Sequence, residues 1–456
     1  MKKRLSIRTV VFFVSWLLFQ AVPSVSEAQE NNSALKDSAS VEDCLKYAFK
    51  NQPFVKQLKL DEQISVQSIR VALSDWLPQI NASAMFQKNL KLPVIYFPDF
   101  SNPSGPKIPV NTGVNYNSAI SFALGQTIFD RDVYLAGSTA GLIRKQSAQT
   151  SRSALIDLVV QVSKSYYSVL LSVEQLRIIQ EDIDRLTIIQ HDAWVSYQNG
   201  VSDNIDYKRA TISLNNSIAQ KRSAEESIKS KLSILKQLIG YPNDKTLLLK
   251  DNYKSLRDDI LLDTLRLPDF NKRIEYQLLK TNLSLQKSNL LYNKLSFLPT
   301  ISGFANYNIN YQNDLSGDLY KKSFPNSAIG LTLGLPLFQG TRRIQNIKKA
   351  RLEYERLSLD TLRLRDQISS EYVQSMAGFQ SNLEAYRETL KNMDITMEVY
   401  NTTKLQYTQG VKAYLEVIVS ETDLMAARIN NLNALYTLMF SKLDVERSLG
   451  NISIDY

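Results

Sequence analysis

Residues 376–400, MAGFQSNLEAYRETLKNMDITMEVY, lie between Gly340 and Gly410, in a segment with no proline and a single glycine, Gly378. Large apolar side chains recur at alternating spacings of three and four, at Met376, Phe379, Leu383, Tyr386, Leu390, Met393, Met397 and Tyr400. This heptad seam predicts a helix that packs against other helices along its length. At about 1.5 Å per residue it would be roughly 100 Å long, several times the ~30 Å core of a bilayer. The charges on its other faces exclude a membrane span.

The first 28 residues have the pattern of a secretory signal peptide. Four basic residues between positions 2 and 8 precede an apolar run over 10–19, and Ser26-Glu27-Ala28 is a small-residue cleavage site. An uncleaved N-terminal anchor is the alternative interpretation. Cleavage would change the formal net charge from +9 to +6, because four basic residues and one acidic residue are removed. Cys44, the only cysteine, offers neither an intramolecular disulfide nor a lipid-attachment site at the mature N-terminus.

The remaining positive charge indicates a solvated surface rather than a nucleic-acid site. No cluster of lysines and arginines interleaved with aromatic residues stands out, so we expect no nucleic-acid partner. After the signal peptide there is no apolar run of 18 or more residues, which predicts no helical membrane span. An exported chain without such spans is either soluble or inserted in a membrane as a β-barrel.

The first half of the mature chain predicts helices around two strands. A helix over 41–76, with Ser40 as its N-cap, ends before Pro78 because proline disfavours helix at the preceding residue. Alternating residues predict strands over 80–86 and 114–124, and five prolines within 88–113 indicate a long exposed loop between them. A long helix from 130 to 198 and a return helix from 204 to 239 complete this half, and a mixed connector occupies 243–267.

The second half repeats this plan. We expect a helix over 269–298, strands over 301–311 and 329–335, the long helix up to Gly410, and a return helix over 413–449. Equivalent landmarks recur after 209 or 210 residues, as Phe129 and Phe338, Tyr197 and Tyr407, Gly200 and Gly410, Asp206 and Glu416, and Gly240 and Gly450. The pattern predicts a tandem duplication, with the signal peptide over 1–28 and the two repeats over 29–245 and 246–456.

The four predicted strands have the length and alternation of transmembrane strands, which need roughly 9–11 residues. Four strands cannot close a barrel, and an open edge in lipid leaves backbone groups unsatisfied. Several copies must therefore share one barrel: two copies would give about 8 strands, the lower limit, and three would give about twelve. The alternative is a soluble two-sheet protein with coiled-coil arms.

Over essentially the whole mature sequence, the chain resembles the TolC-like outer membrane efflux proteins. The motifs that carry the resemblance are Val41-Glu42-Asp43-Cys44-Leu45, Leu77-Pro78, Leu298-Pro299, Gln126-Thr127-Ile128-Phe129-Asp130, Leu335-Pro336-Leu337-Phe338-Gln339-Gly340, and Tyr-x-x-Gly at 197–200 and 407–410. The resemblance implies an α+β membrane protein of the Gram-negative outer membrane. It implies a homotrimer whose shared twelve-stranded β-barrel, with four strands from each chain, continues as a long α-helical barrel in the periplasm.

The resemblance also implies partners and a gate. A periplasmic adaptor would dock at tip residues Gly200, Val201, Gly410 and Val411, and an inner membrane transporter would be reached through it. Glu416 occupies the family's constriction position, whereas Val419 stands where a second acid is often found. Asp206 and Lys412 occupy positions at which an acid and a base hold the tip shut in similar proteins. The alternative is that Glu416, Asp206 and Lys412 are solvated residues at helix starts, where acids are favoured in any case.

Nothing in the sequence indicates an enzyme. The single histidine, His191, lies on a long helix near the tip, and the chain has no Gly-Lys-Ser/Thr phosphate loop and no Cys/His cluster. We therefore expect no cofactor and no metal. The resulting hypothesis is a passive outer membrane exit duct of a tripartite efflux or type I secretion system, with cargo that the wall residues do not name. The alternative is a periplasmic coiled-coil scaffold or adaptor without a pore, which would not need four lipid-length strands.

Overall fold

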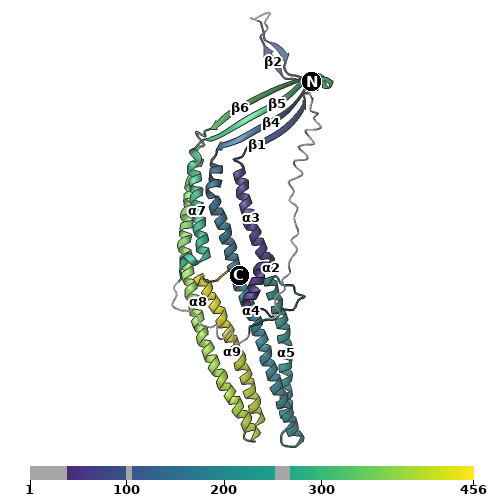
Figure 1. Cartoon of the computed structure of the whole chain (residues 1–456), viewed down its shortest axis with the longest axis vertical. Coiled ribbons are helices and arrows are strands. Elements are labelled where there is room, and N and C mark those ends of the chain that lie inside the picture. The colour runs from purple at the N-terminus through teal and green to yellow at the C-terminus, as the bar shows by residue number, and fades with distance from the viewer. Residues whose placement is uncertain (1–37, 99–104, 252–267) are drawn as a thin grey trace.

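The computed structural model describes residues 38–98, 105–251 and 268–456. The predicted signal peptide over 1–28 and most of the predicted connector over 243–267 lie outside these residues. The described chain is mostly helical, with one main sheet. Figure 1 shows the sheet at one end of an elongated molecule and two helical hairpins that reach the other end.

The first half has the predicted order of elements, with two corrections. Its elements are α2 (Val41–Asn51), α3 (Pro53–Ser74), β1 (Gln79–Lys88), β2 (Val94–Phe97), β3 (Ile108–Asn111), β4 (Tyr116–Phe129), α4 (Arg131–Gln198) and α5 (Asn204–Ile239). The helix expected over 41–76 is two helices, because Gln52, which precedes Pro53, is extended. The expected loop over 88–113 contains the short antiparallel pair β2–β3, in which Pro109 lies opposite Tyr96. Both strands of a two-stranded sheet are edges, and edges tolerate proline.

The second half is also close to the prediction. Its elements are η1 (Phe270–Lys272), α7 (Ile274–Lys294), η2 (Leu295–Phe297), β5 (Thr300–Asn313), η3 (Ser316–Lys321), β6 (Ser323–Gly334), α8 (Arg342–Thr408) and α9 (Tyr414–Leu449). The last strand starts at 323 instead of 329, although it contains Pro325. In the described sheet β6 has a neighbour on one side only, so a missing N–H can be accommodated there.

The predicted N-cap Ser40 is confirmed, and the long helices have caps of their own. Ser40 and Asp43 form a reciprocal capping box at the start of α2, in which the Asp43 N–H donates to Ser40 Oγ at 3.2 Å. Asp130 caps α4 by accepting a hydrogen bond of 2.6 Å from the Asp132 N–H. Gly200 and Gly410, which follow the two long helices, both have positive φ, at +72° and +77°.

The sheet has one apolar face and one polar face. Its four antiparallel strands lie in the order β1-β4-β5-β6, and residues opposite one another in this register share a face. The apolar face contains Ile80, Ala82, Ala84, Phe86, Ile120, Phe122, Leu124, Ala305, Tyr307, Ile309, Ile329, Leu331 and Leu333. The polar face contains Asn81, Ser83, Gln87, Asn117, Ser121, Asn306, Asn308, Asn310, Gln312 and Asn326. The alternation predicted for each strand is therefore continuous across all four.

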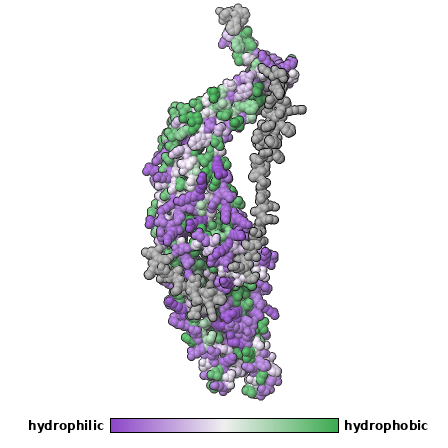
Figure 2. Space-filling view, viewed as in Figure 1, coloured by the Kyte–Doolittle hydropathy of each residue, from purple (hydrophilic) through white to green (hydrophobic). Residues whose placement is uncertain are grey.

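The surface over the sheet also differs from the surface over the helices. Figure 2 shows hydrophobic residues gathered over the sheet and a more hydrophilic surface over the helical body. The side chains of Ile329 and Leu331 are 87% and 75% exposed in the single chain. A soluble protein rarely leaves such a continuous apolar face uncovered, so this face requires a nonpolar environment.

The helical body is held together by apolar seams between the two hairpins. The largest cluster includes Tyr166 from α4, Phe379 from α8 and Tyr436 from α9, each at most 2% exposed. Met376, Phe379, Tyr386 and Tyr400 of the predicted heptad are buried, whereas Met397 remains 38% exposed. By length and composition alone, one described helix, α4, contains a segment apolar enough to span a membrane, and half of that segment is buried inside the protein. Packing in the helical body accounts for that apolar character.

The two return helices end in equivalent joints. Gly240 after α5 and Gly450 after α9 have φ values of +71° and +73°. A Cβ on Gly240 would lie 2.9 Å from Gln52 Cα, and a Cβ on Gly450 would lie 3.1 Å from the Lys272 carbonyl carbon. In each joint the helix end is covered by the backbone of an earlier segment, which begins the helix that leads into the first strand of the same half. Only glycine combines this φ with so close an approach.

We predict that Gly240→Ala and Gly450→Ala each lower the stability of the folded chain. The left-handed conformation costs about 1–2 kcal/mol for a residue with a Cβ, and the close backbone contact adds to this cost. Urea unfolding followed by circular dichroism measures the effect. The control is Gly141→Ala in α4, where a Cβ would meet nothing within 4 Å and the substitution should be neutral or stabilising. Midpoints equal to that of the control would contradict the prediction.

Candidate channel tip and hairpin seam

The two hairpin tips have the same backbone design. In the first, the Gly200 N–H donates to the Tyr197 carbonyl at 3.0 Å, and Val201 follows, 80% exposed. In the second, the Gly410 N–H donates to the Tyr407 carbonyl at 2.9 Å. Val411 follows, 71% exposed. Each tip therefore presents a small glycine and an exposed valine. Figure 1 shows both hairpin tips at the end of the molecule opposite the sheet.

The three predicted gate residues all lie in or beside the first turns of the return helices. Lys412 pairs with Glu416 on the same hairpin, and both side chains are partly exposed. Asp206 lies in the first turn of α5, which Asp203 caps. Within this single chain, then, Lys412 is paired with Glu416. Contact between Asp206 and Lys412 of different copies remains a prediction.

Two tyrosines lie close to the gate residues. The rings of Tyr407 and Tyr414 pack edge to face, with centroids 5.7 Å apart. Burial raises the pKa of Tyr414, and the nearby Tyr407, Asp206 and Asp192 raise it further. The carboxylate of Asp206 is therefore close enough to influence this pair electrostatically. The hydroxyl of Tyr414 is buried and has no hydrogen-bond partner among the described residues.

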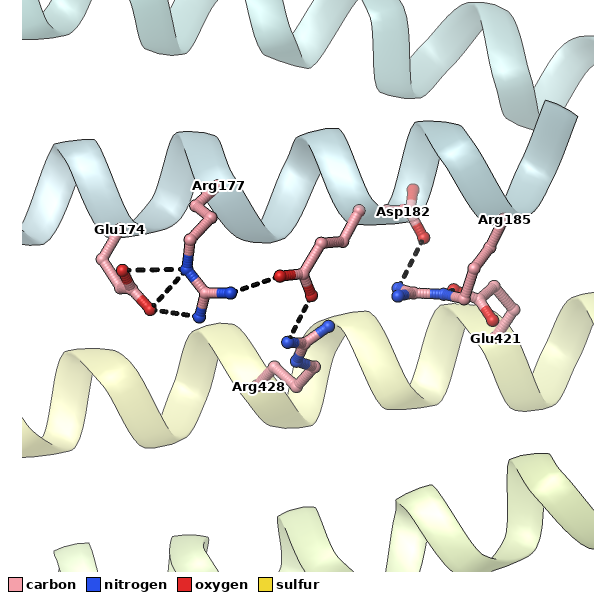
Figure 3. Close-up of polar contacts among 7 residues, drawn as sticks. Glu174, Arg177, Asp182, Arg185, Glu421 and Arg428 are labelled. Atoms are coloured by element: carbon pink, nitrogen blue, oxygen red, sulfur yellow. Dashed lines mark hydrogen bonds and ion pairs between the residues drawn. The ribbon is translucent and has the colours of Figure 1, made fainter. Parts of the chain in front are cut away.

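A network of charged side chains joins α4 to α9 above the tips. Figure 3 shows Arg185 of α4 reaching Glu421 of α9, with a donor–acceptor distance of 2.6 Å from Nε to Oε1. Arg185 also lies 3.7 Å from Asp182, which accepts a hydrogen bond of 2.7 Å from Ser217 Oγ of α5. A second link, also in Figure 3, joins Arg428 of α9 to Glu181 of α4 at 2.6 Å.

The first of these links is buried. Asp182 and Glu421 are 2% and 1% exposed, so both carboxylates depend on Arg185 for a counter-charge. Burial raises the pKa of Glu421, and a hydrogen bond with Asp182 raises it further, whereas Arg185 opposes the shift. Burial and the charge of Glu421 raise the pKa of the neighbouring Tyr400 to about 12. This arrangement couples the first hairpin to the second at a desolvated position.

Sequence reasoning did not find this network. Arg185 and Glu421 are far apart in the chain, and neither belongs to a recognisable motif. The only local signal is that Asp182 and Arg185 interrupt an apolar pattern whose members Ile179 and Leu186 are buried. Charges that interrupt an apolar seam require partners, but the sequence does not identify those partners.

The main sheet carries almost no charged side chains. Lys88, at the end of β1, is the one charged residue in the four strands of the main sheet. The polar face is formed mainly by amides, hydroxyls and small side chains, although Met85, Phe304 and Phe324 also lie on it. Asn308 Nδ2 donates to Asn326 Oδ1 across this face at 2.8 Å. Among the residues that the structure describes, no group of three or more His, Cys, Asp or Glu side chains could hold a metal ion.

These features agree with the comparisons to known proteins. A family model described as outer membrane efflux protein matches residues 45–241 and 282–451, and the chain belongs to that family. Outer membrane protein TolC of Vibrio cholerae is 20% identical over 423 residues, which cover 89% of each chain. Outer membrane protein TolC of Salmonella enteritidis is 20% identical over 443 residues, which cover 92% of this chain and 84% of that one.

Solved structures show the same fold. The structure of CusC, whose description concerns folding and transmembrane channel formation, matches with a TM-score of 0.72 at 17% identity. The match covers 91% of this chain and 93% of the CusC chain. The open-state MtrE outer membrane channel of Neisseria gonorrhoeae matches with a TM-score of 0.69 at 17% identity. The match covers 94% of this chain and 95% of the MtrE chain. The family is one of transport proteins and not a class of enzymes.

We predict that Arg185→Ala destabilises the helical body at neutral pH. The substitution leaves two buried carboxylates without a counter-charge, and breaking such a pair costs about 3–5 kcal/mol. Urea unfolding at pH 7 measures the loss. The matched control is Arg177→Ala on the same helix, where the side chain is 54% exposed and its ion pairs with Glu174 and Glu181 are each worth at most about 1 kcal/mol.

The loss of stability caused by Arg185→Ala should be larger at neutral pH than in acid. Without the arginine, the pKa of Glu421 in the folded chain rises further above its ordinary value of 4.5. The folded chain then keeps a proton that the unfolded chain releases, so stability falls as the pH rises from 4.5 through the folded pKa. The variant should recover stability in acid. An equal loss at every pH would show that Arg185 acts by packing alone.

Proposed function

We propose that this protein is the outer membrane channel of a tripartite efflux or type I secretion system. It passively conducts substrate from an inner membrane pump and a periplasmic adaptor to the exterior. The observation that carries this proposal is the main sheet, with one apolar face, one polar uncharged face and two edges unpaired in the single chain. Membership of the outer membrane efflux protein family supports the same function.

The two unpaired edges argue for assembly. An apolar face of this kind belongs in lipid, where every backbone N–H and C=O group must be paired within the protein. Edge β6 of one copy can pair with edge β1 of the next, and such head-to-tail contacts close into a ring. We propose a homotrimer with a twelve-stranded barrel, in which the polar faces line the pore and the apolar faces meet outer membrane lipid.

The helices continue the pore away from the membrane. At about 1.5 Å per residue, α4 and α8 are each roughly 100 Å long, which is more than three bilayer cores. We propose that they form an α-helical barrel in the periplasm and that the two hairpins derive from repeats over 29–245 and 246–456. The matching tips and the matching joints at Gly240 and Gly450 support the duplication.

The tips are the natural contact points for an adaptor. Gly200 and Gly410 permit close approach of a partner backbone, and Val201 and Val411 offer exposed apolar side chains beside them. Energy for transport would come from the inner membrane pump, because the chain has no nucleotide-binding loop. A scaffold or adaptor without a pore would not need a sheet with one apolar face and one polar face.

The assembly can be tested by the location and mass of the unheated, detergent-extracted protein. We expect it in the outer membrane fraction with the mass of three mature chains, because three copies supply twelve strands. Light scattering or native mass spectrometry, corrected for bound detergent, measures the mass. A soluble monomer or dimer would overturn the channel and leave the helical scaffold as the better account.

The gate is tested by charge reversal. We propose that Asp206 and Lys412 of neighbouring copies attract one another and hold the tip closed, with Glu416 lining the constriction. Asp206→Lys or Lys412→Glu should then raise single-channel conductance in planar bilayers severalfold, because like charges oppose closure. Combining both reversals should restore low conductance.

The control for this test is Lys391→Glu, which reverses an exposed lysine that pairs with Glu388 on α8, away from the tip. It should leave conductance unchanged. If neither single reversal at Asp206 or Lys412 alters conductance, the two residues are solvated helix-start residues and not a gate.

A further inference from the structure

Arg343, at the start of α8, is a buried cation with neutral neighbours. The residue is 8% exposed. Its Nε donates to Gln339 Oε1 at 3.2 Å, and its Nη2 donates to the Pro336 carbonyl. Its guanidinium lies over the ring of Phe297, 5.1 Å from the centroid. None of these contacts neutralises the positive charge.

The other buried charges of the described chain are compensated. Arg273, which is 5% exposed, pairs with Glu275 at 3.1 Å and Glu371 at 2.9 Å. Asp182 and Glu421 pair with Arg185. Among the charged side chains buried in the described residues, Arg343 alone has no opposite charge within ion-pair distance. A buried charge without a partner is costly, so this position calls for an anion from outside the chain.

A cavity beside Arg343 has the groups that an anion would need. It has a volume of about 320 Å³ and lies where α4, α7 and α8 meet the ends of β5 and β6. Arg131 and Arg342 line it together with Arg343, and the buried hydroxyl of Ser296 on its wall has no hydrogen-bond partner. Arg131 stacks over Tyr292 at 4.4 Å and lies 4.0 Å from Asp132. The buried charge without a counter-ion therefore belongs to Arg343, and Arg342 beside it is exposed to solvent.

The surroundings of the cavity point to a lipid. The chain between β6 and α8 exposes Leu335, Leu337 and Phe338 to 52%, 84% and 87%. Figure 2 shows this junction between the hydrophobic surface over the sheet and the hydrophilic helical body. If the sheet spans the membrane, as proposed above, the arginines lie at the level of the lipid headgroups. Basic pockets at such a boundary bind anionic headgroups.

We propose that this cavity binds the phosphate of an anionic phospholipid from the periplasmic leaflet of the outer membrane. The forked guanidinium groups of Arg343 and Arg342 fit phosphate oxygens, and the Ser296 hydroxyl can donate a further hydrogen bond. The acyl chains lie along Leu337 and Phe338. The bound lipid would anchor the junction between strands and helices at the membrane surface. The inference rests on the proposed membrane insertion of the sheet.

The test is lipid binding by the full mature protein in detergent, followed by native mass spectrometry. The protein is titrated with phosphatidylglycerol or with phosphatidylcholine of the same acyl chains. We expect a phosphatidylglycerol adduct for each chain and a much weaker phosphatidylcholine adduct. Arg343→Gln and Arg342→Gln should each weaken phosphatidylglycerol binding by roughly tenfold or more, as loss of a charged hydrogen-bond donor implies.

The matched control is Arg351→Gln on the same helix, where an exposed arginine pairs with Glu355 at 3.2 Å. It should bind phosphatidylglycerol as the unchanged protein does. Circular dichroism of each variant confirms that the helices are intact. A thermal midpoint that rises with phosphatidylglycerol in the unchanged protein, but not in Arg343→Gln, is the second readout.

Three results would overturn the proposal: equal binding of both lipids, undiminished binding by both α8 variants, or complete competition by glycerol phosphate. The last would identify a site for free phosphate esters. Fractionation of the same cells separates this inference from the channel itself. A protein found in the outer membrane but without phosphatidylglycerol preference loses only the lipid site, whereas a protein outside the membrane loses both.

Discussion

A sheet edge cannot remain unpaired in hydrocarbon, and the rest of this architecture depends on that constraint. The four strands align their apolar residues on one face, yet β1 and β6 each have a free side in the described chain. If the sheet spans the membrane as proposed, one copy alone is therefore incomplete. In the proposed homotrimer, closure through further copies would place the polar faces around a common interior and would determine how the attached helices are arranged.

The helical body follows a different rule, because its surface is hydrophilic (Figure 2). Apolar seams around Tyr166, Phe379 and Tyr436 supply most of its cohesion, as hydrophobic burial does in any helical bundle. Buried ions add specificity at two places. Arg273 binds the carbonyl of Ser448 at the end of α9, and Arg185 joins α4 to Glu421. The first contact joins the start of α7 to the end of α9, and the second joins the two hairpins.

Charge is distributed unevenly along the path from sheet to tip. The strands contribute uncharged amides and hydroxyls to their polar face, whereas Asp206, Lys412 and Glu416 concentrate charge at the far end. In the proposed channel, a wall of neutral polar groups would discriminate weakly between cargoes, and control of passage would fall to the tips. The junction around Arg343 is another charged region, and it lies where membrane and water meet in the proposed assembly.

Most of the fold was predictable because its signals are local. The heptad from Met376 to Tyr400, the alternation from Ala305 to Tyr311, and the glycines at 200, 240, 410 and 450 depend on short-range periodicity and backbone geometry. Local signals failed at Gln52, where one helix became two, and at Pro325, which an edge strand accommodates. The gate residues were proposed from a family resemblance, and their role remains a prediction. Only the tertiary structure joined Arg185 to Glu421 and left Arg343 without a counter-ion. Such contacts depend on helix register and burial, which bring together residues that no sequence spacing connects.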